Sequence, residues 1–135
     1  MRIAPKDYRT RAFTLVELLV VILVLSVLMA VALPLYLAAI ANSERTACRA
    51  NMQSIADAEQ AFRARVAPHV YTTTLTGLDP DLWSTPICPR QGVYTVVVSD
   101  GTLIANNGSI VPIGGLVVKC TQSAHGVYAP SIDAE

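Results

Sequence analysis

The segment "RTRAFTLVELLVVILVLSVLMAVALPLY" occupies residues 9–36 and decides the fold of this 135-residue chain. Its basic residues end at Arg11, Glu17 follows, and no charged residue occurs in residues 18–41. An α-helix rises about 1.5 Å per residue, so a run of this length can cross a hydrocarbon core of about 30 Å. The sequence therefore predicts a membrane-spanning helix over residues 13–41.

The uneven charge distribution predicts the orientation of this helix. The first twelve residues carry four basic side chains and one acidic one, namely Arg2, Lys6, Arg9 and Arg11 against Asp7. The remainder of the chain is mildly acidic. A basic leader stays in the cytoplasm, so residues 42–135 are expected to be exported. A secretory signal peptide has a shorter apolar region, of about 7–15 residues. Without a basic patch after the leader, no nucleic-acid binding is predicted.

Glu17 stands at the start of the apolar run without a suitable basic partner. An ionised carboxylate in lipid costs several kcal/mol unless it is paired, and Arg11 is poorly placed on a helix. One interpretation puts Glu17 at the level of the lipid headgroups. Another requires cleavage between Ala12 and Phe13, because the new α-amine could pair with Glu17 of the same chain or of a neighbour. A low dielectric would strengthen that pair.

The stretch "RAFTLVELLVVILVLSVLMAVALP", residues 11–34, resembles the class III signal of type IV pilins and type II secretion pseudopilins. That signal is a basic leader and a small residue, followed by Phe-Thr-Leu-Val-Glu and an apolar helix. The resemblance implies that a prepilin peptidase cuts after Ala12, where the family usually has Gly, and methylates Phe13. It implies that Glu17 pairs with a neighbour's N-terminus during assembly, and that the helix kinks and loosens near Pro34.

The resemblance also implies the architecture, partners and location of the chain. The expected fold is α+β: after the leader of residues 1–12, a long N-terminal helix, whose first half spans the membrane, packs on a small antiparallel sheet. The expected partners are other pilin-like subunits, in a homo- or hetero-oligomer, the prepilin peptidase/methyltransferase and an inner-membrane assembly platform. The chain would cross the inner membrane once and then enter a pilus or a secretion pseudopilus; the sequence does not choose between these.

The helical pattern continues through residues 42–67, which contain no Gly or Pro and are rich in alanine. Apolar residues recur on one stripe at helical spacing, which predicts a core face: Cys48, Met52, Ile55, Phe62 and Val66. Glu59 falls on the same stripe, and we expect it at the edge, paired with Arg63 four residues on. The Ala67-Pro68 pair is expected to end the helix.

Residues 68–92 are predicted to be a loop, residues 93–120 a β-sheet, and residues 121–135 a C-terminal loop. The sheet should contain strands at 93–98, 103–105, 109–111 and 116–120, which are rich in β-branched residues. Asp100-Gly101 and Asn107-Gly108 are expected to form hairpin turns. Asp79 and Asp81 supply too few oxygen ligands, at no recognisable spacing, for a calcium site.

The chain has three cysteines, Cys48, Cys88 and Cys120. In an exported domain, a Cys88–Cys120 disulfide would close a loop of about 30 residues and stabilise the fold by about 3–4 kcal/mol. A metal site using Cys88, Cys120 and His125, with or without Cys48, is the alternative. It is disfavoured because zinc sites usually contain CxxC-type pairs, which are missing here. Cys48 is expected to be a buried small apolar residue, and no metal or cofactor is predicted.

Three functional classes remain open. The first is a structural filament subunit, which the resemblance favours. The second is a single-span membrane protein whose exported domain binds a partner and never polymerises. The third is a membrane-tethered enzyme, but neither His69 nor His125 belongs to a recognisable catalytic arrangement. The chain is therefore predicted not to be an enzyme.

Overall fold

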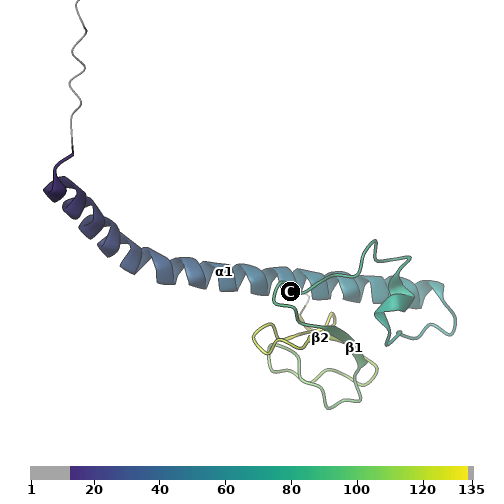
Figure 1. The fold of residues 1–135 in the computed structure, drawn as a ribbon. Coiled ribbons are helices and arrows are strands. Elements are labelled where there is room, and N and C mark those ends of the chain that lie inside the picture. The colour runs from purple at the N-terminus through teal and green to yellow at the C-terminus, as the bar shows by residue number, and fades with distance from the viewer. Residues whose placement is uncertain (1–12, 134–135) are drawn as a thin grey trace, which may run out of the picture. The chain divides into compact units, whose positions relative to one another are not determined.

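The computed structural model describes residues 13–133, so the leader of residues 1–12 lies outside the described part. The elements, in order, are the helix α1 (Leu15–Arg65), the 3-10 helix η1 (Leu75–Leu78) and the strands β1 (Tyr94–Val98), β2 (Leu116–Cys120) and β3 (Val127–Tyr128) (Figure 1). The chain divides into two units, one ending at Ala39 and the other beginning at Ile40. Each unit is described separately.

The first unit is the N-terminal part of α1. Every large apolar side chain from Leu15 to Leu37 is exposed. By length and composition this part of α1 is apolar enough to cross a membrane, and none of its most apolar window is buried. Pro34 lies inside α1, which continues past it to Arg65. The long apolar helix is therefore confirmed, whereas a kink and loosening at Pro34 stay a prediction.

In the second unit, the C-terminal part of α1 packs against the strands (Figure 1). Cys48, Met52 and Ile55 are wholly buried, and Phe62 is half-buried against the same core. The sheet and η1 supply the opposing residues of this core: Leu78, Tyr94, Val96, Leu116, Val118 and Tyr128. The predicted stripe is therefore the core face of α1, although the helix ends at Arg65 rather than at residue 67.

Within residues 13–133 the sheet has three antiparallel strands in the order β1-β2-β3. Tyr94 pairs with Cys120 at one end of the β1–β2 ladder, and Val98 pairs with Leu116 at the other. Both faces of β2 are covered, because Val118 faces the α1 core while Val117 packs in a second small cluster. The remaining buried members of that cluster are Ala105, Val111 and Ala129. This explains why β2 is apolar at consecutive positions.

The segment between β1 and β2 differs from the prediction. The strands expected at 103–105 and 109–111 are reduced to a single bridge between Ile104 and Ile110. Asn107-Gly108 makes the expected turn between them, where the N–H of Ser109 donates to Asn107 Oδ1 at 2.9 Å. Pro112, which has no N–H, follows directly and limits further pairing.

The hairpin predicted at Asp100-Gly101 is wrong. These residues turn the chain out of β1, and the N–H of Thr102 donates to Asp100 Oδ1 at 2.9 Å. β1 pairs instead with β2, and the N–H of Ser99 prolongs that pairing by donating to Gly115 O at 2.8 Å. The third strand, β3, lies in the segment predicted to be a C-terminal loop.

The expected pair between Glu59 and Arg63 is also wrong. Glu59 is wholly buried, and its Oε2 accepts a hydrogen bond from the N–H of Thr72 at 3.0 Å. Arg63 donates to His69 O and to the Tyr71 hydroxyl, both at 3.0 Å. The segment after α1 folds back along the helix, so Glu59 and Arg63 bond to residues of this segment and not to each other. Burial raises the pKa of Glu59 above its ordinary value, and the N–H of Thr72 opposes that rise in part.

Candidate functional sites at the helix start and in a cysteine-histidine cluster

The first candidate site is the N-terminus of α1, where Thr14 precedes the first helical residue. The carboxylate oxygen Oε2 of Glu17 accepts hydrogen bonds from the N–H of Thr14 at 3.0 Å and from its hydroxyl at 2.9 Å. In return, the N–H of Glu17 donates to Thr14 Oγ1 at 3.2 Å. This reciprocal pattern is a capping box, which satisfies N–H groups that a helix start otherwise leaves unpaired.

The capping box gives Glu17 a partner in its own chain that the sequence analysis missed. The Thr-x-x-Glu spacing before an apolar run is its signature and could have revealed it. All the hydrogen bonds to the carboxylate use Oε2, so within residues 13–133 the second oxygen has no partner. Glu17 can therefore cap its helix and still present an oxygen to an external cation. Ala12, on the other side of the expected cut, lies outside the described residues.

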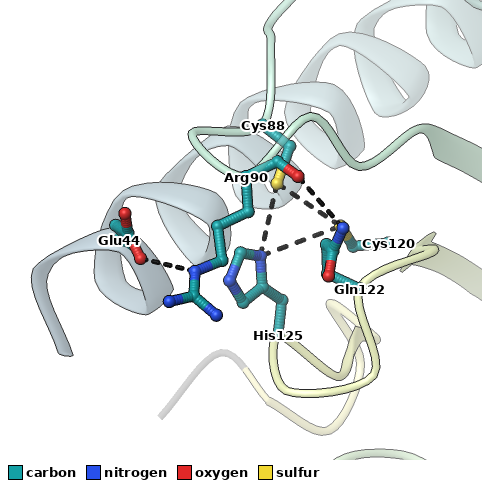
Figure 2. A network of polar contacts seen from close by, with 6 residues as sticks. All are labelled: Glu44, Cys88, Arg90, Cys120, Gln122 and His125. Atoms are coloured by element: carbon teal, nitrogen blue, oxygen red, sulfur yellow. Dashed lines mark hydrogen bonds and ion pairs between the residues drawn. The ribbon is translucent and has the colours of Figure 1, made fainter. Parts of the chain in front are cut away.

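The second candidate site is a cluster of four side chains, here called the cysteine-histidine cluster: Cys48, Cys88, Cys120 and His125. Their Sγ atoms and one imidazole nitrogen all lie within 4.8 Å of one another. His125 Nδ1 is 3.3 Å from Cys88 Sγ and 3.9 Å from Cys120 Sγ, and the two sulfurs are 3.7 Å apart. Figure 2 shows the Cys88, Cys120 and His125 side chains pointing toward one another.

Four separate segments of the chain build this cluster. Cys48 comes from α1, Cys88 from the loop before β1, Cys120 from the end of β2, and His125 from the connection to β3. A turn closed by the N–H of His125 on Gln122 O, at 2.9 Å, places the imidazole beside β2. Tertiary structure therefore brings together residues that are far apart in the sequence.

Polar contacts around the cluster hold its loops in place (Figure 2). The Gln122 side-chain amide donates to Arg90 O at 3.0 Å, which ties the His125 turn to the Cys88 loop. Arg90 in turn forms an ion pair with Glu44 on α1, with 2.7 Å between Nε and Oε2. The loop carrying Cys88 is thus anchored to both the helix and the connection after β2.

Gly92 leaves space that the sulfurs of Cys88 and Cys120 occupy. A Cβ at this position would lie 2.7 Å from Cys120 Sγ and 3.2 Å from Cys88 Sγ. These separations are too short for a carbon and a sulfur atom in a well-packed interior, where overpacking is destabilising. A glycine is therefore required here by the close approach of the sulfurs to the backbone.

A second set of contacts reaches Cys48. The Tyr94 hydroxyl donates to Cys48 Sγ at 3.4 Å, and the Asn51 amide donates to both the Tyr94 hydroxyl, at 3.1 Å, and Ile87 O, at 3.0 Å. Burial raises the pKa of the Cys48 thiol to about 12, although the Tyr94 hydroxyl opposes the rise. Asn51 therefore links Cys48, through the Tyr94 hydroxyl, to Ile87, the residue just before Cys88.

The pKa of the Cys88 thiol shifts in the opposite direction from that of Cys48. Burial alone would raise its pKa, but hydrogen bonds from the backbone N–H groups of Arg90 and Gly92, and from the neighbouring thiols, outweigh burial and leave the pKa below its ordinary value. N–H groups directed at sulfur favour the thiolate, which is the form that binds metal ions.

The structure brings the predicted disulfide partners Cys88 and Cys120 together, but both are free thiols in it. A disulfide bond has a length of about 2.05 Å, so the pairing stays a prediction. Cys48 is buried, as expected, but its sulfur also joins the cluster. The sequence alone disfavours a metal site made of these residues, because no CxxC spacing marks a site built from four segments.

Comparisons with known proteins bear on the N-terminal site. Residues 8–33 match the family model described as the prokaryotic N-terminal methylation motif. Over 120 residues the chain is 25% identical to the type IV major pilin protein PilA of Myxococcus xanthus (strain DK1622), an alignment that covers 89% of this chain and 52% of the relative. The chain thus spans about half the length of that relative. No solved structure matches.

The match to the methylation motif extends into the apolar N-terminal part of α1, as expected for a prepilin signal. Together with the similarity to PilA, this match confirms the resemblance to type IV pilins that residues 11–34 predicted. The observed architecture, a long helix packed on a small antiparallel sheet, agrees with the expected α+β fold. The matched relative is named as a major pilin, and the expectation that this chain is not an enzyme stays a prediction.

Proposed function

We propose that this chain is a structural subunit of a type IV pilus or of a type II secretion pseudopilus. A prepilin peptidase cuts between Ala12 and Phe13 and methylates the new amine. The processed subunit then leaves the inner membrane and joins other pilin-like subunits in a helical filament. In the membrane, the leader faces the cytoplasm and the second unit lies outside, as the charge distribution of the leader predicts.

The observation that carries the proposal is the fully exposed apolar surface of α1 from Leu15 to Leu37. A surface of this size is stable only in lipid or against other apolar surfaces. Copies of one helix that pack through different faces form a heterologous contact, and such a contact produces an open helical filament when its rotation does not close. The first unit therefore has the properties of both a membrane anchor and a filament core.

Glu17 gives this assembly its register. Cleavage would create a positive charge at Phe13, the residue immediately before the capping box. The free oxygen of Glu17 can accept a hydrogen bond from the amine of an adjacent subunit while the other oxygen keeps its bonds to Thr14. In an apolar bundle the attraction between these charges is much stronger than in water.

Two substitutions separate the capping role of Glu17 from its proposed role in assembly. Glu17→Gln keeps a side-chain acceptor for the Thr14 N–H but removes the charge. Thr14→Val removes the hydroxyl from the capping box and leaves the carboxylate intact. We expect Glu17→Gln to abolish filament formation and Thr14→Val to weaken it little, because an N-cap change costs only about 1 kcal/mol.

The measurement combines electron microscopy of sheared filaments with mass spectrometry of the mature N-terminus. The proposal requires a methylated Phe13 in the wild type and in both variants, with filaments missing only from Glu17→Gln. If both variants assembled equally well, Glu17 would be a capping residue alone. An intact Met1 in the membrane-bound chain, without any filament, would instead support a non-polymerising single-span protein with an exported binding domain.

A further inference from the structure

We propose that the cysteine-histidine cluster is a structural zinc site, in which three thiolates and one imidazole hold a single Zn²⁺ in the exported unit. All four ligands lie in the second unit, so the proposal is independent of processing and of filament assembly. It replaces the predicted disulfide as the cross-link of this small domain.

The distances within the cluster fit a tetrahedral ion. Zinc binds thiolate sulfur at about 2.3 Å and imidazole nitrogen at about 2.0–2.1 Å, which puts ligand sulfurs about 3.8 Å apart and sulfur and nitrogen about 3.5 Å apart. The observed separation of Cys88 Sγ and Cys120 Sγ is 3.7 Å. His125 Nδ1 lies 3.3 Å and 3.9 Å from these sulfurs. Three of the ligand atoms thus have separations close to those around zinc, and Cys48 Sγ lies within 4.8 Å of each of them.

The chemistry of the donors selects the metal class. Three thiolates and one imidazole form one of the usual closed sets of structural zinc, and they are poor ligands for calcium or magnesium. Cys48, Cys88 and His125 are buried and Cys120 is half-buried, as in a closed site without a position for substrate. The site is therefore expected to stabilise the fold and to perform no catalysis.

Neighbouring residues hold the proposed ligands in place, as hydrogen bonds to the ligands do in known metal sites. The Tyr94 hydroxyl, held by Asn51, donates to Cys48 Sγ at 3.4 Å. Gly92 keeps the space beside the sulfurs of Cys88 and Cys120 free of a side chain. These contacts are directed at sulfur atoms that lie at the edge of the α1 core.

A disulfide accounts for fewer of these observations. It would use Cys88 and Cys120 alone, and it would leave Cys48 Sγ and His125 Nδ1 directed at the same point for no reason. Within residues 13–133, the side chain of buried His125 makes its hydrogen-bonding contacts with sulfur atoms only. Buried polar groups are normally paired, and a metal ion would satisfy this nitrogen and all three sulfurs together.

The test uses the full chain, purified in detergent without added metal or reductant. Zinc content is measured by inductively coupled plasma mass spectrometry, and free thiols are counted by alkylation after denaturation in a chelator. We expect one zinc ion per chain and three alkylated cysteines. Exchange of zinc for Co²⁺ should give thiolate-to-cobalt charge-transfer bands and the visible bands of a tetrahedral ion, a readout that needs no variant.

Variants then identify the ligands. Cys48→Ser and His125→Asn should each lower zinc retention against a competing chelator by at least tenfold, on the order of the loss for disturbed metal sites. The matched control is His69→Asn, since His69 is exposed, lies outside the cluster and has a positive φ of 63° that asparagine tolerates. This control should retain zinc like the wild type.

Several outcomes would overturn the proposal. A chain that carries a Cys88–Cys120 disulfide and no zinc would show that oxidation, not metal binding, links these residues. Three free thiols without zinc, and without tetrahedral cobalt bands after reconstitution, would show that the cluster is ordinary packing. Full zinc retention in both ligand variants would place the metal elsewhere.

Discussion

Replacing Glu59 by glutamine should stabilise the second unit at neutral pH and leave it nearly unchanged in acid. Glu59 is wholly buried, and within the described residues 13–133 only its Oε2 has a partner, the N–H of Thr72. An unsatisfied buried polar atom costs about 1–3 kcal/mol, and more when the group is charged. Glutamine keeps an oxygen for Thr72 and replaces the buried charge by a neutral amide, so Glu59→Gln should gain about 1.4 kcal/mol for each pH unit by which the folded pKa of Glu59 exceeds the unfolded one.

The sign of the pH dependence follows from the raised pKa. The native state holds the Glu59 proton above the ordinary pKa of 4.5, where the unfolded chain has already released it. The stabilising contribution of this proton is complete below that value and is lost as pH rises through the folded pKa, with a slope of up to about 1.4 kcal/mol per pH unit. The wild type should therefore lose stability with rising pH relative to Glu59→Gln.

The assay is denaturant unfolding of the detergent-solubilised chain at about pH 5, close to the ordinary pKa, and at about pH 8, well above it. Near-ultraviolet circular dichroism reports on the second unit because Tyr94 and Tyr128 are buried there. The difference between variant and wild type removes contributions common to both chains, including acid release of a bound metal. Asp57→Asn is the matched control, an exposed acid on the same helix, and should stay within about 0.5 kcal/mol of wild type.

Equal free energies of unfolding for wild type and Glu59→Gln at both pH values would refute this reasoning. That result would mean that the carboxylate reaches water or an unrecognised cation in the native state. A variant less stable than the wild type at about pH 8 would show that the charge itself is needed, and the Thr72 hydrogen bond would then be the dominant contribution.

Two further substitutions probe the cysteine-histidine cluster. Gly92→Ala places a Cβ 2.7 Å from the Cys120 sulfur, so it should lower the free energy of unfolding by about 1–3 kcal/mol and reduce the amount of bound zinc. The control is Gly77→Ala, whose Cβ would have its nearest side-chain atom at 3.4 Å, and it should change neither quantity. Tyr94→Phe removes the hydroxyl between Asn51 and Cys48 and should cost about 1 kcal/mol; an unchanged chelator-competition profile would show that this hydroxyl does not support the metal ligand.

The parts of the fold that depend on local patterns could be predicted from the sequence. The apolar run and the helical stripe specify α1 without any knowledge of its partners, and the β-branched runs specify β1 and β2. Strand β3 could not be found in this way, because two residues, Val127 and Tyr128, carry no detectable period. Asp100-Gly101 has the composition of a hairpin turn, but the long ladder between β1 and β2 outweighs the local preference there.

The two candidate sites also differ in whether a local sequence pattern reveals them. The N-terminal signal is continuous in sequence, and even its capping box follows a readable Thr-x-x-Glu spacing. The cysteine-histidine cluster exists only after α1, the loop before β1 and both ends of the β2–β3 connection have come together. Glu59 is a parallel case, since its partner, Thr72, lies in a segment whose path along the helix no periodicity indicates.

The choice between a disulfide and a metal ion has a structural consequence for the exported domain. A domain of about 90 residues is marginal by core size alone, and small domains commonly rely on a cross-link. A Cys88–Cys120 bond would join a loop to a strand that the Tyr94–Cys120 pairing already holds nearby. A metal ion would also bind Cys48 and His125, and so would attach α1 itself to the sheet. In the proposed filament α1 is the element that packs against other subunits, so the metal would add to the existing core packing a link between α1 and the sheet that the disulfide would not supply.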